Sequence, residues 1–394
     1  MLTAVALLVT LHGPAAAGPP SRGLVEATGR GEVLFLPRHH VQPFVGWVYS
    51  RAATSCLAVE SAMLDPERWP KIFENLKRAR ATRTGDTVRY ELDLTVAFSP
   101  TIHGVITRME PGRLRFSDVE TKAYSEYTLE DLPDGTCLSR YSVVEEQGRS
   151  SGWVGIIKGL EATAGDAGNF AAAISSSRGF SRPERAPRVT PGRAGEQLLD
   201  ELAGRGTVVS IDRSGRRPVY VLRRRVAASF DEVTRALRDR ATYARRTAVV
   251  RSSAGKGGGA EYAMGGFGGR VNFTTTVREA VDAAGVLSIE ETPASGDLQV
   301  DDGGWRWRVN SVDGGAEVEL RFGCDVIDGS LVLKTVANTD PIARESFMLH
   351  VALSLVGDLV PGRPLPLSPA VVASPPPPAT AVVERSGSAV GAGH

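Results

Sequence analysis

The sequence repeats itself, and the repeat limits the folds that the chain can adopt. The stretch MLDPERWPKIF, residues 63–73, corresponds to LRDRATYARRT, residues 237–247. Just upstream, residues 44–59 align without a gap to residues 218–233. Because 394 residues are enough for two or three domains of ordinary size, the repeat predicts two domains that share one fold.

Strand signals are clean in the first copy. Between Val88 and Phe98 apolar residues alternate with polar ones, which is the period of a sheet with one buried and one solvated face. The segments that follow are joined by links too short for crossover helices, so an antiparallel meander is predicted. Further strands are expected at residues 102–109, 113–119, 125–130 and 137–145.

A change of period follows these strands. Apolar residues from Trp153 to Ile174 recur at helical spacing, which predicts a helix of about 25 residues. Its middle is rich in Gly and Ala, which is typical either of close packing on the sheet or of space left for a ligand. The second copy shows the same order and ends in a helix after Asp340-Pro341, an N-cap followed by proline at the first helical position.

The two ends of the chain differ from the repeated part. An apolar run from Leu2 to Leu11, followed by small residues, is typical of a secretory signal, although no Lys or Arg precedes it. We therefore expect a periplasmic or secreted protein, with a plain N-terminal segment as the alternative. The proline-rich end, with PPPP at 375–378, is expected to be disordered.

The chain is divided on these grounds into a signal peptide (1–17), an N-terminal segment (18–40), a first domain (41–180), an extended linker (181–207), a second domain (208–361) and a disordered tail (362–394).

Charge argues against nucleic acid as a partner, because 46 basic residues face 45 acidic ones. Basic residues nevertheless gather between Arg213 and Arg251. Within this stretch Arg223, Arg224 and Arg225 are candidates for contact with an anionic membrane surface, at about 1 kcal/mol each. A solvated face, or contact with acidic strands of the first copy, are the alternatives.

The three cysteines, Cys56, Cys137 and Cys324, include no CxxC pair and predict no zinc site. In an exported protein a bridge between Cys56 and Cys137 is possible, whereas scattered thiols are more often small buried hydrophobic residues.

The order of strand, broken helix, meander and terminal helix resembles the START-like superfamily, also called the SRPBCC or polyketide cyclase superfamily. The segment Leu64-Asp65-Pro66-Glu67-Arg68-Trp69-Pro70 is the most specific part of the resemblance, which covers residues 41–180 and, more faintly, 216–361. It implies an α+β fold of two tandem helix-grip domains, each a curved antiparallel sheet around a long C-terminal helix. It also implies apolar cavities for lipids, sterols or polyketides, and no shared catalytic motif.

Motifs for chemistry are sparse. The glycine-rich stretch around Phe267 lacks the G-x-x-x-x-G-K-[ST] pattern of a phosphate loop, and we interpret it as a hairpin tip in which Phe267 gates the second cavity. His39-His40 has no third metal ligand nearby. His103 and His350 are candidates for a general base, or for ordinary structural histidines. In Trp305-Arg306-Trp307-Arg308 the alternation predicts inward tryptophans and solvated arginines, with stacking on a ligand ring as the alternative.

The side chains on the predicted inward faces are almost wholly apolar, which favours a non-enzymatic protein that binds an apolar or amphipathic small molecule without metal or cofactor. A cyclase or dehydratase-type enzyme, which would need a titratable pair facing the cavity, is the second hypothesis. A scaffold with a filled interior is the third. The candidate lining residues are Tyr90, Leu92, Leu94, Trp153, Ile157, Leu160 and Phe170 in the first copy, and Phe273, Trp305, Trp307, Phe347 and His350 in the second.

Overall fold

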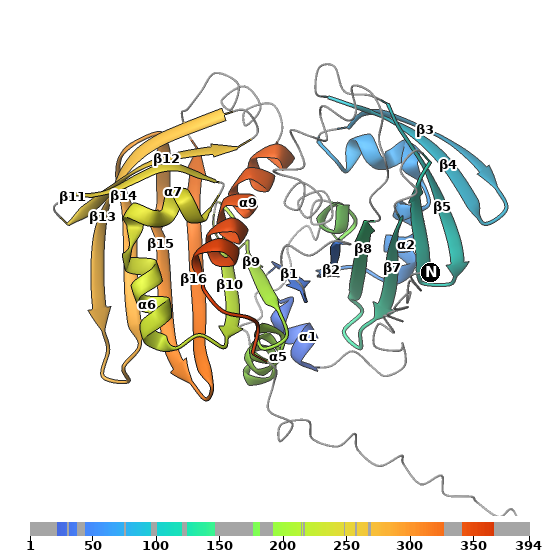
Figure 1. Cartoon of the computed structure of the whole chain (residues 1–394). Coiled ribbons are helices and arrows are strands. Elements are labelled where there is room, and N and C mark those ends of the chain that lie inside the picture. The colour runs from blue at the N-terminus through green and yellow to red at the C-terminus, as the bar shows by residue number, and fades with distance from the viewer. Residues whose placement is uncertain are drawn as a thin grey trace, which may run out of the picture.

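The computed structural model describes residues 22–29, 31–37, 44–74, 76–95, 101–119, 124–145, 176–181, 192–213, 215, 217–247, 249–256, 258–266, 269–326 and 341–365. Within these residues the strands form one antiparallel sheet of sixteen, in the order β11-β12-β13-β14-β15-β16-β10-β9-β1-β2-β8-β7-β6-β5-β4-β3. The sheet curls at both ends into two lobes (Figure 1). We call residues 22–181 the first half and residues 192–365 the second half.

The first half begins with a short helix and two strands, continues through a broken helix, and ends in a meander. Its elements are α1 (Arg22–Ala27), β1 (Gly31–Leu36), β2 (Phe44–Ala52), α2 (Cys56–Met63), the 3-10 helix η1 (Pro66–Lys71), β3 (Leu76–Thr84), β4 (Thr87–Leu94), β5 (Ile102–Glu110), β6 (Arg113–Asp118), β7 (Tyr124–Asp131) and β8 (Cys137–Glu145). The meander predicted from the alternating pattern is confirmed from β4 to β8. The terminal helix predicted for residues 153–174 lies outside the described residues.

The second half repeats this order. Its elements are α5 (Arg193–Ala203), β9 (Thr207–Asp212), β10 (Val219–Val226), α6 (Phe230–Arg238), η2 (Arg240–Thr242), α7 (Tyr243–Arg246), β11 (Val250–Lys256), β12 (Gly259–Gly266), β13 (Gly269–Val281), β14 (Leu287–Gly296), β15 (Leu298–Val312), β16 (Gly315–Val326) and α9 (Pro341–Leu359). The predicted final helix is confirmed, starting at its proline. Mostly antiparallel sheet with few helices is consistent with a helix-grip α+β fold. Among the described helices none is long and apolar enough to cross a membrane.

The repeated sequence motif has a shared local structure. Ser55 and Ser229 are the N-caps of α2 and α6, and their hydroxyl groups accept hydrogen bonds from backbone N–H groups of the first turn. After the helix break, the Trp69 indole donates to the carbonyl of Ala62 at 3.0 Å, and the Tyr243 hydroxyl donates to the carbonyl of Leu237 at 2.5 Å. In both copies the aromatic residue therefore bonds back to the end of the preceding helix, which fixes the angle of the break.

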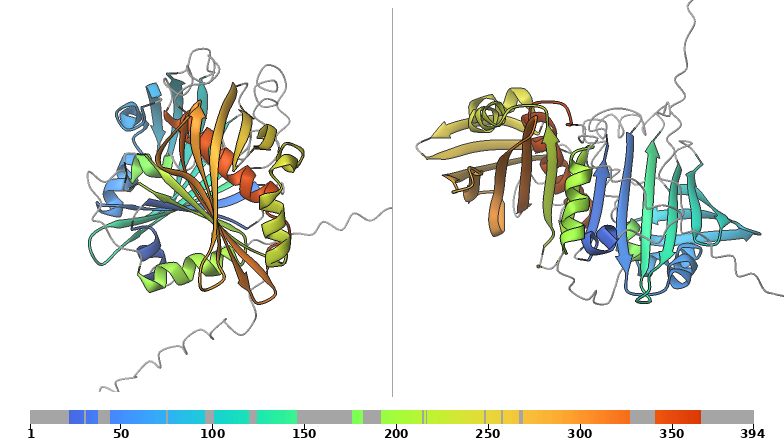
Figure 2. Two further views of the ribbon diagram at one scale, coloured as in Figure 1. Left: turned by 90° about the vertical axis from the view of Figure 1, so that its left-hand side faces the viewer. Right: turned by 90° about the horizontal axis from the view of Figure 1, so that it is seen from below.

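The halves are joined by pairing between β1 and β9, in which Leu34 lies opposite Val209 (Figure 2). Helices α1 and α5 cover one face of this junction, where Phe35, Leu199 and Val208 share an apolar cluster. The opposite face, with Leu34 and Val209, belongs to the large core that also includes α9. Both faces of the junction are thus buried, as expected of a rigid connection.

Two expectations about connecting segments need correction. The extended linker predicted for residues 181–207 is wrong in its second part, because residues 193–203 form helix α5. The segment predicted before the first domain, residues 18–40, contains strand β1. These elements belong to the duplicated unit, since α1-β1 and α5-β9 stand at the same place in the two halves.

The possible disulfide is present. Cys56 at the start of α2 is bridged to Cys137 at the start of β8, while Cys324 is a free, buried thiol. In the second half Phe230 begins the corresponding helix and Ala316 begins the paired part of the corresponding strand. An apolar pair therefore stands where the first half has a covalent link.

Candidate functional site

The inward face of the second half combines an apolar wall with one charged pair. Along β14, Leu287, Ile289 and Glu291 are buried, and Glu291 has no exposed surface. On the neighbouring strand β15, Trp305 lies opposite Glu291 and is 3% exposed. Because alternate residues of a strand point to the same face, Glu291 shares the face of Leu287 and Ile289, which belong to the apolar cluster that includes residues of α9.

Aromatic rings line this wall. Tyr262 stacks on Phe273 with ring centroids 5.3 Å apart, and Phe273 meets Trp305 edge-on at 5.8 Å. Trp305 in turn stacks on Phe322 at 6.1 Å. Such a wall offers flat apolar surface, which suits planar or aliphatic molecules alike.

Three donors surround the Glu291 carboxylate. The guanidinium Nε of Arg240, from η2 at the helix break, donates to Oε1 at 3.0 Å. The Tyr262 hydroxyl donates to Oε2 at 2.7 Å, and the Thr275 hydroxyl donates to the same oxygen at 3.3 Å. A buried charge is tolerated when it is paired and hydrogen-bonded in this way.

The same contacts set the protonation of the neighbours. Burial raises the pKa of Tyr262 well above its usual value, and the negative charge of Glu291 raises it further. For Arg240, burial lowers the pKa, but the attraction of Glu291, Tyr262 and Tyr243 and the hydrogen bond to Glu291 together outweigh burial, and the pKa is raised. At neutral pH the Arg240 guanidinium is therefore charged and the Tyr262 phenol is neutral.

Two buried donors on this side of the second half have no acceptor among the described residues. Arg240 Nη2 lies 3.9 Å from Glu279 Oε1 and makes no hydrogen bond within the described part of the chain. The same holds for the indole Nε1 of Trp307, which is 1% exposed. Because buried polar atoms are nearly always hydrogen-bonded in native proteins, these two donors are exceptions that call for a partner.

The predicted residues of the second copy meet here in part. Phe273, Trp305 and Trp307 are buried together on the inward face, and Arg306 and Arg308 are exposed, so the inward orientation of the tryptophans is confirmed. His350 lies half-buried on α9. The side chain of Phe347 is outside the described residues, as are Phe267, His39 and His40, although the hairpin around the predicted tip is confirmed by the pairing of Gly266 with Gly269.

In the first copy Tyr90, Leu92 and Leu94 belong to the interior cluster around Trp69. Trp153, Ile157, Leu160 and Phe170 lie outside the described residues. His103 is on the outer face, with 43% of its side chain exposed and Nδ1 3.9 Å from Glu91 Oε1. It is Gly104, the next residue, that points inward against Tyr90, so the general-base hypothesis for His103 is wrong.

The arginines proposed for a membrane surface make internal contacts instead. Arg223 pairs with Glu319 at 2.9 Å and with Glu196 on α5 at 2.5 Å. Arg225 pairs with Glu317 at 2.6 Å, and Arg224 is 8% exposed. The prediction of a lipid-facing surface is therefore wrong for these three residues, whose charges are either neutralised by acidic neighbours or buried.

The expectation of almost wholly apolar inward faces is also wrong at Glu291 and at Arg224, which alternates with the buried Leu222 and Val226 on β10. Glu291 was overlooked because it follows Glu290, and two adjacent acids look like a solvated pair. The alternation Leu287, Ile289, Glu291 was the signal that placed it inward. Arg240 gave no signal, since residues at a helix break have no fixed period. No group of three potential metal ligands occurs among the described residues.

Comparison with known proteins gives similarity in structure alone. No protein-family model and no curated protein matches this sequence. The di-domain ARO/CYC proteins StfQ and BexL, from the steffimycin and BE-7585A biosynthetic pathways, are 12% and 13% identical to it, both with a TM-score of 0.25. These matches cover 78% and 81% of this chain and 96% and 99% of those chains.

A STAR-related lipid transfer protein fragment from Xanthomonas axonopodis is 12% identical, with a TM-score of 0.26, and the match covers 38% of this chain and 92% of that chain. With TM-scores this low, the evidence for the fold is the strand order and register of the chain itself.

Proposed function

We propose that this protein binds an apolar or amphipathic small molecule on the inward face of its second half, and that each half is a helix-grip domain. The observation that carries the proposal is the buried Glu291–Arg240 pair beside the aromatic wall, with Arg240 Nη2 left without an acceptor among the described residues. A wall of this kind binds the apolar body of a ligand, and the free donor meets an oxygen atom of its polar group.

The two parts contribute differently to affinity. Burial of a ligand against Phe273, Trp305 and Trp307 supplies about 0.8 kcal/mol per methylene group. A hydrogen bond from a charged guanidinium is stronger than a neutral one and requires a defined position. The wall would therefore provide most of the binding energy, while Arg240 would select molecules that carry an acceptor oxygen at one end.

A cyclase or dehydratase-type enzyme is the second candidate, and one observation favours it. Glu291 and Tyr262 form a titratable pair on the inward face, 2.7 Å apart, as proton transfer in such an enzyme would need. Both carboxylate oxygens of Glu291 already accept hydrogen bonds, which weakens it as a base, so binding is the better-supported function. Turnover of a retained molecule by the wild type but not by Tyr262→Phe would reverse this order.

Native mass spectrometry of the purified chain, with extraction of any retained molecule, tests the proposal. We expect one apolar molecule per chain in the wild type and its loss in the double variant Glu291→Leu/Arg240→Leu, which removes the donor without leaving a buried unpaired charge. Glu290→Leu is the matched control, because Glu290 is the next residue on β14 and pairs with Arg306 on the outer face at 2.7 Å. A wild-type chain that stays empty in the presence of lipid mixtures would favour the scaffold hypothesis.

We further propose that the protein is exported. The N-terminal pattern supports this, and so does the Cys56–Cys137 bridge, because disulfides persist mainly in oxidising compartments. N-terminal sequencing of protein recovered from the periplasm or the medium should find a start near residue 18. Recovery only from the cytoplasm, with residues 1–17 intact, would contradict export.

A further inference from the structure

The interior of the first half is filled by aromatic side chains around Trp69. Its indole lies 5.2 Å from the ring of Tyr90, 6.1 Å from Phe116 and 5.5 Å from Phe180. Phe116 continues the cluster to Tyr127 at 5.0 Å. The first half thus has an aromatic cluster like that of the second half, built from strands β4, β6 and β7 and from Trp69 of η1. One further ring comes from a segment beyond the meander.

Phe180 is that ring. It is 7% exposed and sits edge-on between three others, at 84° to Phe73, 69° to Trp69 and 88° to Tyr127. Edge-to-face contacts on several sides are the preferred surroundings of a phenyl group. The slot therefore fits a single aromatic ring, whichever molecule supplies it.

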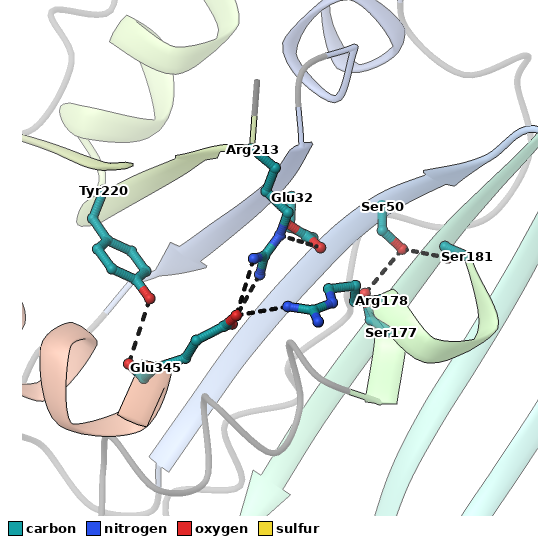
Figure 3. Close-up of polar contacts among 8 residues, drawn as sticks. All are labelled: Glu32, Ser50, Ser177, Arg178, Ser181, Arg213, Tyr220 and Glu345. Atoms are coloured by element: carbon teal, nitrogen blue, oxygen red, sulfur yellow. Dashed lines mark hydrogen bonds and ion pairs between the residues drawn. The ribbon is translucent and has the colours of Figure 1, made fainter. Parts of the chain in front are cut away.

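The segment that carries Phe180, residues 176–181, is attached to the sheet by hydroxyl groups. The hydroxyl groups of Ser177 and Ser181 lie 2.9 Å and 2.8 Å from the hydroxyl of Ser50 on β2 (Figure 3). The Ser50 hydroxyl also contacts Ser139 on β8 at 2.6 Å. Such bonds add about 1 kcal/mol each to stability, because water replaces them when they break. Apart from the packing of Phe180, residues 176–181 are thus held on the sheet by hydrogen bonds that are weak enough to break.

Arg178 links the same segment to the second half. Its Nη1 donates to Glu345 Oε1 on α9 at 2.6 Å, and Arg213 holds the other carboxylate oxygen at 3.1 Å (Figure 3). Arg213 is itself fixed by Glu32 at 2.7 Å. The position of Phe180 is therefore coupled to α9, the helix that faces the candidate site.

The close approach of residues 176–181 to Phe73 also requires a glycine at position 179, between Arg178 and Phe180. A Cβ atom on Gly179 would lie 2.0 Å from the ring of Phe73, so a larger residue would hold the segment away from the cluster. Each residue of this segment thus has its own contact. Ser177 and Ser181 bind the sheet, Arg178 binds α9, Gly179 lies against Phe73, and Phe180 lies among the aromatic rings.

We propose that the first half contains a second binding site, for a molecule with a phenyl-sized aromatic ring, and that Phe180 occupies this site in the structure. Residues 176–181 act as a clasp, and the Arg178–Glu345 pair holds it closed. The site is independent of the function proposed for the second half, and only the coupling through α9 rests on that function.

The test follows the indole N–H signals of the full chain, labelled with ¹⁵N in its five tryptophans, during titration with p-cresol. Trp69→Phe assigns the Trp69 signal. We expect this signal to shift in Arg178→Gln and in Phe180→Ala at p-cresol concentrations that leave it unchanged in the wild type. Amide exchange within 176–181 should be about tenfold faster in Arg178→Gln.

Arg306→Gln is the control, since it removes an ion pair on the outer face of the second half. Phe180→Leu serves if Phe180→Ala fails to fold. An unshifted Trp69 signal in both folded variants overturns the second site, and equal shifts in wild type and Arg178→Gln overturn the clasp. Shifts confined to the signals of Trp305 and Trp307 would mean that p-cresol binds in the second half. The Trp69 signal tests the second site and the Trp305 and Trp307 signals test the second half, so the two proposals can fail independently.

Discussion

Glu291 shows how one side chain can change the interpretation of a whole interior. Its carboxylate is fully buried, yet the free-energy cost of burying this charge is small because Arg240, Tyr262 and Thr275 all donate hydrogen bonds to it. Removing one partner of such a pair leaves an uncompensated charge, whereas removing both leaves an apolar site. Comparing the single and the double variant therefore shows whether the folded state depends on the Glu291–Arg240 pair itself or only on neither charge being left unpaired.

Glu291→Leu should therefore destabilise the second half by about 3–5 kcal/mol, because Arg240 loses its buried partner. The double variant Glu291→Leu/Arg240→Leu should recover most of that loss. Denaturant unfolding, followed by tryptophan fluorescence, measures both. If the single variant were as stable as the control Glu290→Leu, the pair would not be buried as described.

Among the helices, α2 is the one with a covalent attachment. The Cys56–Cys137 bridge spans a sequence separation of 81, and the N–H of Cys56 also donates to Asp131 at 2.9 Å. Helix α6 in the second half has no such bond and relies on its capping box and on apolar contacts instead.

Replacing both Cys56 and Cys137 by alanine should lower stability by about 4 kcal/mol, since a bridge over a loop of this length mainly restricts the unfolded chain. Calorimetry of the oxidised protein and the double variant gives the difference. Cys324→Ala is the control: it keeps the bridge, so its stability should match that of the wild type and should fall in the same way when reductant is added. A double variant that melts at the wild-type temperature would show that the bridge does not form.

Elements could be predicted from the sequence wherever their pattern is local. Strands β4 to β8 and α9 carry their own alternation or helical spacing, and short links define the meander. Strand β3 was missed because all but three of its residues are exposed, so no apolar alternation marks it. Strands β1 and β9 were missed because their pairing joins residues that are distant in the sequence, such as Gly31 and Asp212. Helix α5 was missed because prolines next to it suggested a linker.

The whole molecule is held together by the β1–β9 junction and by the ion pairs across it. Glu345 on α9 joins Arg178 of the first half to Arg213 of the second (Figure 3). Burial raises the pKa of Glu345, but the two guanidinium groups outweigh this and lower it below its ordinary value of 4.5. These long-range contacts have no local sequence signal, which is why the inter-half network could not be predicted.

Acid should therefore loosen the contact between the halves. Because the pKa of Glu345 is lower in the folded than in the unfolded chain, its contribution is complete above pH 4.5 and is lost as the pH falls through the lowered value. Glu345→Gln should show a smaller loss of stability between pH 7 and pH 3 than the wild type, measured by thermal unfolding. A slope equal to that of the wild type would mean that Glu345 is not ion-paired.

The most direct evidence for the proposed function is a crystal structure of the exported protein, purified without added ligand. We predict continuous density on the inward face of β14 and β15, against Trp305, with an oxygen atom within hydrogen-bonding distance of Arg240 Nη2. An interior in which α9 and the aromatic wall are in direct van der Waals contact, with Arg240 Nη2 bonded to the chain, would contradict it.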